Sequence, residues 1–122
     1  MVKVLVVDDN AVARALFKEL VAGVASVEVA GEAASGEEGL QRARERAFDV
    51  VVMDWSMPDI DGVEATTRLC AAHPGIRVVG WTSTDDAAVH HAFTAAGAEA
   101  VFVKERVVPL LRFLSDAAAA AA

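Results

Sequence analysis

The sequence contains little cysteine, no tyrosine and no long run of apolar residues. Cys70 is the only cysteine among 122 residues, so an internal disulfide and a multi-thiolate metal site are excluded. A chain without disulfides is expected in the cytoplasm by default. A membrane span needs roughly 18 apolar residues in a row, and no window approaches that length. The short apolar run at residues 2–7 ends in two acids, which is not the pattern of a secretory signal peptide.

Positive charge is also scarce, and this limits the partners that suit the chain. The 18 Asp and Glu outnumber the 11 Lys and Arg, the formal net charge is -7, and the basic residues form no cluster. Nucleic acid is therefore a poor partner, whereas a divalent cation or a basic protein surface fits. With 122 residues, 55% of them apolar, the chain predicts one folded domain. The Ala-rich stretch 116–122 is expected either to extend a helix or to begin a linker.

Short apolar stretches that end in turn or acidic residues alternate with amphipathic stretches. Strands are expected at residues 2–7, 27–30, 50–54, 76–82 and 99–103, with Gly31 starting the turn out of the second. Helices are expected to begin near Ala11, at the capping box Ser35–Glu38, at Asp61–Gly62, at the cap Thr84 and at Pro109. The second helix is expected to turn Leu40, Ala43 and Ala47 inward. This (βα)5 alternation predicts a five-stranded, doubly wound parallel sheet of the flavodoxin-like α/β class.

The carboxyl end of every strand in such a sheet lies on one edge, and the residues that follow the strands are chemically notable. The expected tip residues are Asp8, Asp9, Asp54, Thr82 and Lys104. In an open parallel sheet, ligands bind at this edge. Three neighbouring carboxylates repel one another unless a cation compensates, and Mg²⁺ is the ion that takes one or two carboxylates together with phosphate oxygens.

These residue types suit the transfer of one phosphoryl group. Asp54 is expected to be the nucleophile that forms an aspartyl-phosphate, and also a metal ligand. Asp9 is expected to be the other direct ligand, with Asp8 acting through water and the backbone carbonyl near Ser56 completing the set. Lys104 would neutralise charge on the phosphoryl oxygens while the hydroxyl of Thr82 donates a hydrogen bond to the same group.

The whole chain resembles the receiver domain of bacterial two-component response regulators. The resemblance rests on Asp8-Asp9, on Met53-Asp54 leading into Met57-Pro58-Asp59-Ile60-Asp61-Gly62, on Trp81-Thr82-Ser83, on Gly97-Ala98 and on Val103-Lys104. The run from Met57 to Leu69 is also similar to receivers of the nitrate-response type, which precede a helix-turn-helix domain. The resemblance implies Mg²⁺, a phosphohistidine donor (a sensor histidine kinase or a histidine phosphotransfer protein) and a downstream effector domain or protein. It also implies a switch in which Thr82 moves toward the phosphoryl group.

Two positions depart from that family. The resemblance implies an aromatic residue three positions before the lysine, where this chain has Val101, so the usual aromatic switch is not expected. Phe102 is expected to face the opposite way, because side chains alternate along a strand. Glu105 stands where the family often has a proline after the lysine, so a trans bond is expected. If exposed, Val107 and Val108 would suit a partner or dimer surface on the side of the fourth and fifth helices.

Plainer interpretations stand beside these. Asp61 is placed to cap a helix, Cys70 and Trp81 are expected in the core, and Trp55 suits either local packing or shielding of the site. The neighbours His90 and His91 point apart on a helix and are expected to be solvated. A small aspartate-nucleophile phosphatase, an FMN carrier and a receiver-like interaction module that is never phosphorylated are the competing functions. The first two do not fit adjacent acids after the first strand, and a conventional enzyme is not expected.

Overall fold

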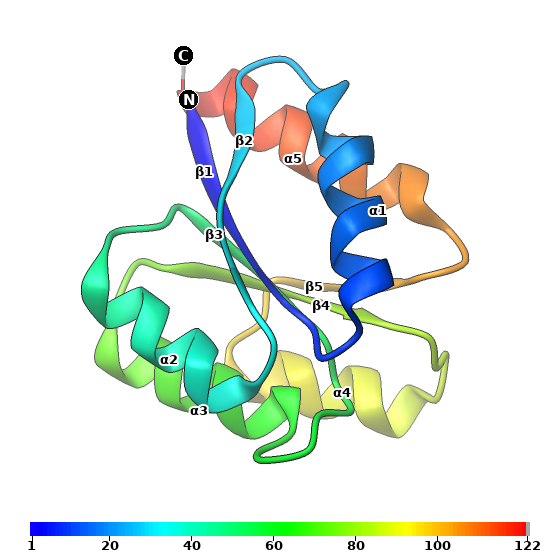
Figure 1. The fold of residues 1–122 in the computed structure, drawn as a ribbon. Coiled ribbons are helices and arrows are strands. Elements are labelled where there is room, and N and C mark those ends of the chain that lie inside the picture. The colour runs from blue at the N-terminus through cyan, green and yellow to red at the C-terminus, as the bar shows by residue number, and fades with distance from the viewer. Residues whose placement is uncertain (122) are drawn as a thin grey trace.

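The computed structural model describes residues 1–121, which form five parallel strands alternating with five helices (Figure 1). The strands are β1 (Val2–Val7), β2 (Val27–Ala33), β3 (Val50–Met53), β4 (Arg77–Thr82) and β5 (Ala100–Val103). The helices are α1 (Ala11–Ala22), α2 (Gly36–Glu45), α3 (Gly62–Ala72), α4 (Ala87–Ala96) and α5 (Val107–Ala121). The sheet order is β2-β1-β3-β4-β5. The predicted doubly wound, flavodoxin-like α/β class is confirmed.

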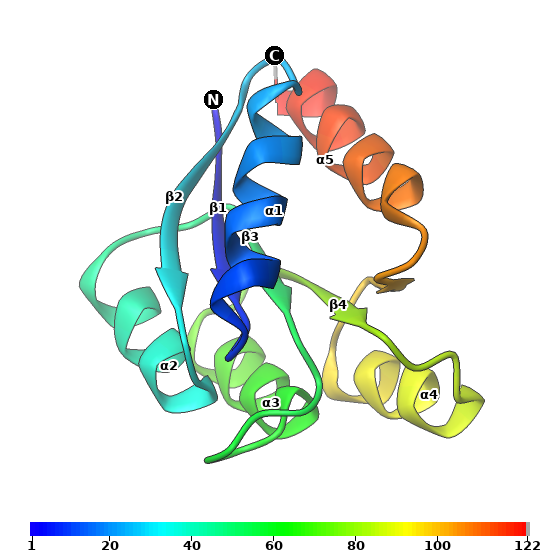
Figure 2. The same cartoon turned by 45° about the vertical axis from the view of Figure 1, so that its right-hand side comes forward.

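Helices cover both faces of the sheet and create two hydrophobic clusters. Figures 1 and 2 show α1 and α5 on one side and α2, α3 and α4 on the other. Side chains alternate between the two faces along β1. Val4 and Val6 pack in the cluster under α1 and α5, whereas Leu5 and Val7 pack in the cluster under α2, α3 and α4. The inner strands are therefore buried on both faces, as their continuous apolar runs predicted.

The second strand is longer than the sequence indicated. β2 continues to Ala33, because the pairing with β1 shifts by one residue between Val4 and Leu5 and the strand then resumes. Gly31 pairs with Leu5 instead of starting a turn. A Cβ at Gly31 would lie 2.8 Å from the ring of Phe48, so the glycine lets that ring pack closely.

Three details of the helices differ from prediction. Asp86, not Thr84, is the N-cap of α4, while the Thr84 hydroxyl accepts a hydrogen bond from Asp86 N. The last helix begins two residues before Pro109, which lies within its first turn, where a missing N–H costs nothing. Ala47 is exposed beyond the end of α2, although Leu40 and Ala43 are buried as predicted.

The buried face of α1 is not the face on which apolar residues recur most regularly. Phe17 and Val21 are buried, whereas Val12 and Leu16 are 77% and 53% exposed. The Ala-rich end continues α5 through Ala121, and residue 122 lies outside the described residues. Among residues 1–121, no helix combines the length and the apolar character that a membrane span needs.

Candidate functional site

The ends of β1 and β3 bring three carboxylates together. Val7 and Met53 are paired in parallel register, and Asp54 N donates to the Val7 carbonyl at 2.9 Å. The residues that follow the two strands therefore lie side by side. Asp8, Asp9 and Asp54 each offer a carboxylate oxygen, and these oxygens lie within 4.8 Å of one another. Asp8 and Asp54 are buried and Asp9 is exposed, so the cluster opens to solvent on one side.

Lys104 follows β5 and reaches into the same cluster. Its Nζ donates to Asp8 Oδ2 at 2.6 Å and lies 3.3 Å from Asp54 Oδ1. Burial alone would lower the pKa of Lys104, but the hydrogen bond to Asp8 and the charge of Asp54 raise it above its ordinary value. The lysine is therefore a permanent cation, placed between the two buried acids.

The surroundings of Asp54 disfavour its charged carboxylate, which therefore readily binds a proton or reacts with an electrophile. Burial, followed by repulsion from Asp8, raises the pKa of Asp54 to about 6, against the opposing effects of Lys104 and the Trp55 N–H. The Trp55 N–H donates to Asp54 Oδ1 at 2.9 Å. Within residues 1–121, Oδ2 receives no such hydrogen bond. One carboxylate oxygen is thus anchored and the other is free to react.

A glycine closes the loop that carries Asp54. Gly62 N donates to the Trp55 carbonyl at 2.8 Å, which folds the loop between β3 and α3 back on itself. A Cβ built at Gly62 would lie 1.9 Å from the Asp54 carbonyl oxygen. Asp61 caps α3 by accepting from Glu64 N, as the sequence predicted. The loop that presents Asp54 therefore depends on close backbone contact at one residue.

Thr82 and Val101 lie on the neighbouring strands. Thr82 is buried at the end of β4, and its hydroxyl accepts a hydrogen bond from Thr84 N at 3.2 Å. Val101 packs into the cluster under α2, α3 and α4, whereas Phe102 packs on the other face against Phe113. The expected opposite orientation of Phe102 is confirmed. No cis peptide bond occurs in the described part of the chain, in agreement with the trans bond expected between Lys104 and Glu105.

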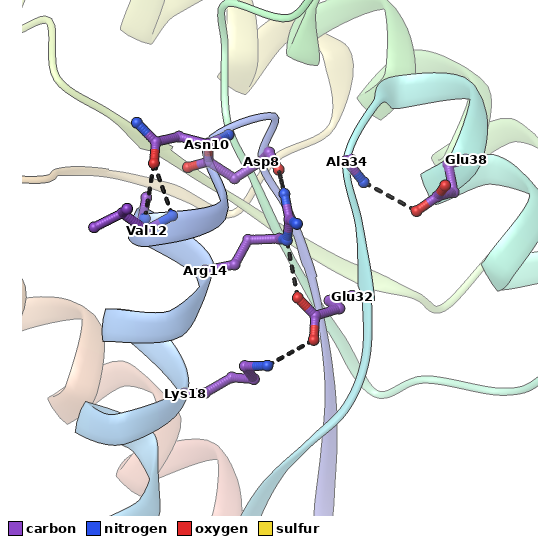
Figure 3. Close-up of polar contacts among 9 residues, drawn as sticks. Asp8, Asn10, Val12, Arg14, Lys18, Glu32, Ala34 and Glu38 are labelled. Atoms are coloured by element: carbon purple, nitrogen blue, oxygen red, sulfur yellow. Dashed lines mark hydrogen bonds and ion pairs between the residues drawn. The ribbon is translucent and has the colours of Figure 1, made fainter.

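An arginine that the sequence did not single out holds the backbone of the acidic loop (Figure 3). Arg14 Nη1 donates to the Asp8 carbonyl oxygen at 2.6 Å, and its Nε donates to Glu32 Oε1 at 2.9 Å. Lys18 donates to the other oxygen of Glu32, and these two hydrogen bonds, that of Lys18 first, lower the pKa of Glu32. The acidic loop is thereby tied to both α1 and β2. The sequence signal that could have identified Arg14 is a basic residue about one helical turn after the acid pair Asp8-Asp9.

The remaining residues of interest have structural contacts. His90 is half-buried and its ring nitrogen lies 2.8 Å from the Thr84 carbonyl oxygen, so the expectation that it is solvated is wrong, whereas His91 is exposed as expected. Cys70 is half-buried against the cluster under α2, α3 and α4, and Trp55 packs there too. Trp81 is buried in the other cluster, as predicted.

A parallel sheet whose carboxyl edge gathers three acids, a buried threonine and a lysine defines a phospho-accepting receiver domain. The family model for the response regulator receiver domain matches residues 4–112, and the chain belongs to this family. The class belongs to two-component signalling, which implies a histidine kinase as partner, and it is not a conventional enzyme. The three acids form a group that could hold a metal ion.

Similar proteins agree with this assignment. The chain is 41% identical over 104 residues to the response regulator GacA of Pseudomonas syringae, covering 85% of this chain and 49% of the relative. It therefore spans about half the length of the curated relatives it matches. The receiver domain of the response regulator NarL from Mycobacterium tuberculosis superposes with a TM-score of 0.88 at 25% identity, covering 97% of this chain and 96% of that one. A LuxR-family response regulator from Aurantimonas gives a TM-score of 0.90 at 26% identity, covering 97% and 85%. The resemblance of the run from Met57 to Leu69 to receivers of the nitrate-response type agrees with these matches.

Proposed function

We propose that Asp54 is the residue that accepts the phosphoryl group, from a phosphohistidine on a sensor histidine kinase or a histidine phosphotransfer protein. The observation that supports this most is the asymmetric environment of the Asp54 carboxylate. Its Oδ1 is engaged by the Trp55 N–H and faces Lys104 at 3.3 Å, while Oδ2 receives no hydrogen bond from residues 1–121. Attack by Oδ2 would form an O–P bond as the P–N bond to histidine breaks, and the imidazole nitrogen would keep the electron pair.

The other residues of the cluster suit supporting roles. Lys104 already lies within reach of an oxygen of Asp54, so a short movement of its Nζ would pair it with a phosphoryl oxygen. Thr82 would donate its hydroxyl proton to the same group, since this hydroxyl now only accepts a hydrogen bond. Its movement would also release Thr84 N, which changes the loop before α4. The route by which Val101 takes part in the switch differs from that of an aromatic residue.

The donor set fits a hard divalent ion. Carboxylate oxygens within 4.8 Å of one another, with one acid exposed, match the oxygen ligands and retained waters that Mg²⁺ prefers. Asp9 and Asp54 would be direct ligands, Asp8 would act through water, and the backbone carbonyl of Ser56 would complete the set. Bound Mg²⁺ would offset the negative charge of the incoming phosphoryl group.

We also propose the setting in which this domain works. Residues 1–122 form a single receiver domain that acts in the cytoplasm, with 116–121 as a helical extension. Its phosphorylation would alter contacts with an effector domain or protein, or a homodimer contact on the face of α4 and α5, where Val108 is 61% exposed. The acidic surface does not favour direct binding of nucleic acid by this domain.

Labelling with a small phosphodonor distinguishes this function from an interaction module that is never phosphorylated. Wild-type protein incubated with acetyl phosphate and Mg²⁺ should gain the mass of one phosphoryl group, and acid or hydroxylamine should remove it. Asp54→Asn should show no gain because the nucleophile is absent. Asp49→Asn is the matched control, since Asp49 precedes the same strand at its opposite end and should not affect labelling. Unlabelled wild type, or a label that persists in Asp54→Asn, would show that the assignment is wrong.

Loss of the arginine contact should weaken the metal site. Arg14→Gln removes a charge-assisted hydrogen bond to the Asp8 carbonyl, a contact worth about 1.5 kcal/mol, so the acidic loop must be ordered when the ion binds. We expect the Kd for Mg²⁺, measured by calorimetric titration, to rise by up to about ten-fold, the factor reached when metal binding bears the whole of that cost. Arg77→Gln breaks an ion pair with Glu99 away from the acidic cluster and should leave the Kd unchanged. Equal Mg²⁺ affinity in the two variants would contradict a role for Arg14 in the site.

A further inference from the structure

Trp81 is buried next to the site, but none of the roles proposed above involves it. It is 3% exposed, it immediately precedes Thr82 on β4, and its side chain lies in the cluster under α1 and α5. Within residues 1–121, its Nε1 is the one buried side-chain nitrogen or oxygen without a hydrogen-bond partner. Leaving a buried N–H unpaired is unfavourable, so a core position would be better filled by phenylalanine or leucine if packing were its whole purpose.

The ring face of Trp81 contacts the lysine of the site. Lys104 Nζ lies 5.0 Å from the centroid of the ring. A cation within about 6 Å of an aromatic face is attracted by the ring quadrupole, and tryptophan offers the strongest such face. The ammonium group is thus held by Asp8 and Asp54 on the one hand and by the indole on the other. The indole provides an attraction that a phenylalanine would provide more weakly.

A second aromatic ring sets the plane of the indole. Phe17 of α1 is fully buried, and its ring lies 5.2 Å from that of Trp81 with an interplanar angle of 50°. The other aromatic residue near this strand end, Phe102, packs against Phe113 instead. Val101, on the opposite face, has no ring. Trp81 is therefore the aromatic residue that this chain places against the charged group of its site.

We propose that Trp81 is a positioning residue for phosphoryl transfer, whose indole face keeps the Lys104 ammonium at the reacting carboxylate. This inference rests on the proposed role of Lys104. When Asp54 becomes phosphorylated and its carboxylate charge is masked, Lys104 must exchange one partner for another. The ring attracts the ammonium whatever the state of Asp54, so it limits the space that the lysine explores during that exchange. The expected consequence is a faster transfer step and little change in metal affinity, because Trp81 is not among the acids that would bind the ion.

Three substitutions separate the ring face from packing. Trp81→Leu removes the face, and the initial rate of labelling by saturating acetyl phosphate should fall about five-fold, with the Kd for Mg²⁺ within about two-fold of wild type. Trp81→Phe keeps an aromatic face and should recover most of the rate. Phe102→Leu removes a packed ring from the same cluster without touching the lysine, and its rate should match that of wild type. If Trp81→Leu labels as fast as Phe102→Leu, or Trp81→Phe is as slow as Trp81→Leu, the proposal is wrong.

Fluorinated tryptophan provides a test that preserves the fold. Since the chain has two tryptophans, Trp55→Phe leaves Trp81 as the only site for incorporation. Singly and doubly fluorinated tryptophan keep the shape of the indole but withdraw electron density from its face, so the labelling rate should fall in that order relative to Trp55→Phe itself. A rate that does not depend on fluorination overturns the role of Trp81. Failure of wild type to accept phosphate at Asp54 would instead overturn the proposed function.

Discussion

Replacing Gly62 by alanine is expected to destabilise the folded protein by about 3 kcal/mol or more and to abolish phosphate acceptance. The added Cβ would lie 1.9 Å from the carbonyl oxygen of Asp54 and 3.1 Å from the Met53 side chain. A flexible side chain could yield to such a contact, but a backbone carbonyl at the end of a buried strand cannot. Either α3 must move away from β3, or the peptide after Asp54 must rotate and redirect the carboxylate.

Urea unfolding and acetyl phosphate labelling test this expectation together. Gly23→Ala is the matched control, because Gly23 has φ -85° and a Cβ there would lie 3.6 Å from its nearest neighbour, the Leu20 carbonyl oxygen. Alanine fits that conformation, and a gain of about 0.4–1 kcal/mol is expected from the reduced entropy of the unfolded chain. If Gly62→Ala unfolds at the same urea concentration as wild type, the loop tolerates a side chain and the close contact has no energetic importance.

The parts of the site predictable from sequence are those that strand direction determines. Asp8 and Asp54 follow directly on buried strands and Lys104 follows a half-buried one, and parallel pairing then leaves them no place except one edge of the sheet. This conclusion does not depend on which of the strands are neighbours in the sheet. The ion pairs of Lys104 with both acids follow from that edge, because the lysine side chain is long enough to reach across it.

Features that depend on a distant partner could not be predicted in the same way. Nothing within residues 27–33 indicates that the strand passes Gly31, because its continuation depends on the shifted pairing with β1 and on the close approach of the Phe48 ring to Gly31. The helix α1 has apolar residues on two faces, and the spacing does not reveal which one packs. Burial of the large ring of Phe17 against Trp81 decides the orientation and leaves Val12 and Leu16 outward. The bond from Arg14 to the Asp8 carbonyl likewise follows from that orientation.

Asparagine at position 54 should make the metal-free protein more stable than wild type near neutral pH, even as it removes the proposed function. Wild-type Asp54 is 7% exposed, and its burial together with Asp8 raises its pKa from the ordinary 3.8 to about 6. Above pH 6 the folded protein therefore carries a carboxylate that the unfolded chain would solvate better. A neutral amide avoids this cost, and Lys104 keeps its shorter contact with Asp8. A gain on the order of 1–2 kcal/mol is expected at pH 7.5.

The difference in stability between Asp54→Asn and wild type should depend on pH. Between pH 4 and 6 the folded state binds the proton more tightly than the unfolded state, so wild type becomes more stable as the pH falls through this range, about 6 being the folded pKa of Asp54. The advantage of Asp54→Asn should thus be largest at pH 7.5, shrink through pH 6 and vanish near pH 4. Bound Mg²⁺ stabilises only the folded state, so saturating metal should favour wild type over the variant.

Urea unfolding in EDTA at pH 7.5 and pH 4.5, repeated at pH 7.5 with excess Mg²⁺, measures all three effects. Asp49→Asn changes an exposed acid at the other end of the same strand and should show no gain at pH 7.5. If Asp54→Asn is less stable than wild type in EDTA at pH 7.5, the interaction with Lys104 outweighs the burial of charge. The acidic cluster would then be a stabilising ion-pair network in its own right. If the gain appears and Mg²⁺ reverses it, the cluster carries a charge imbalance that a divalent ion relieves, which is the condition expected of a site built to receive both metal and phosphate.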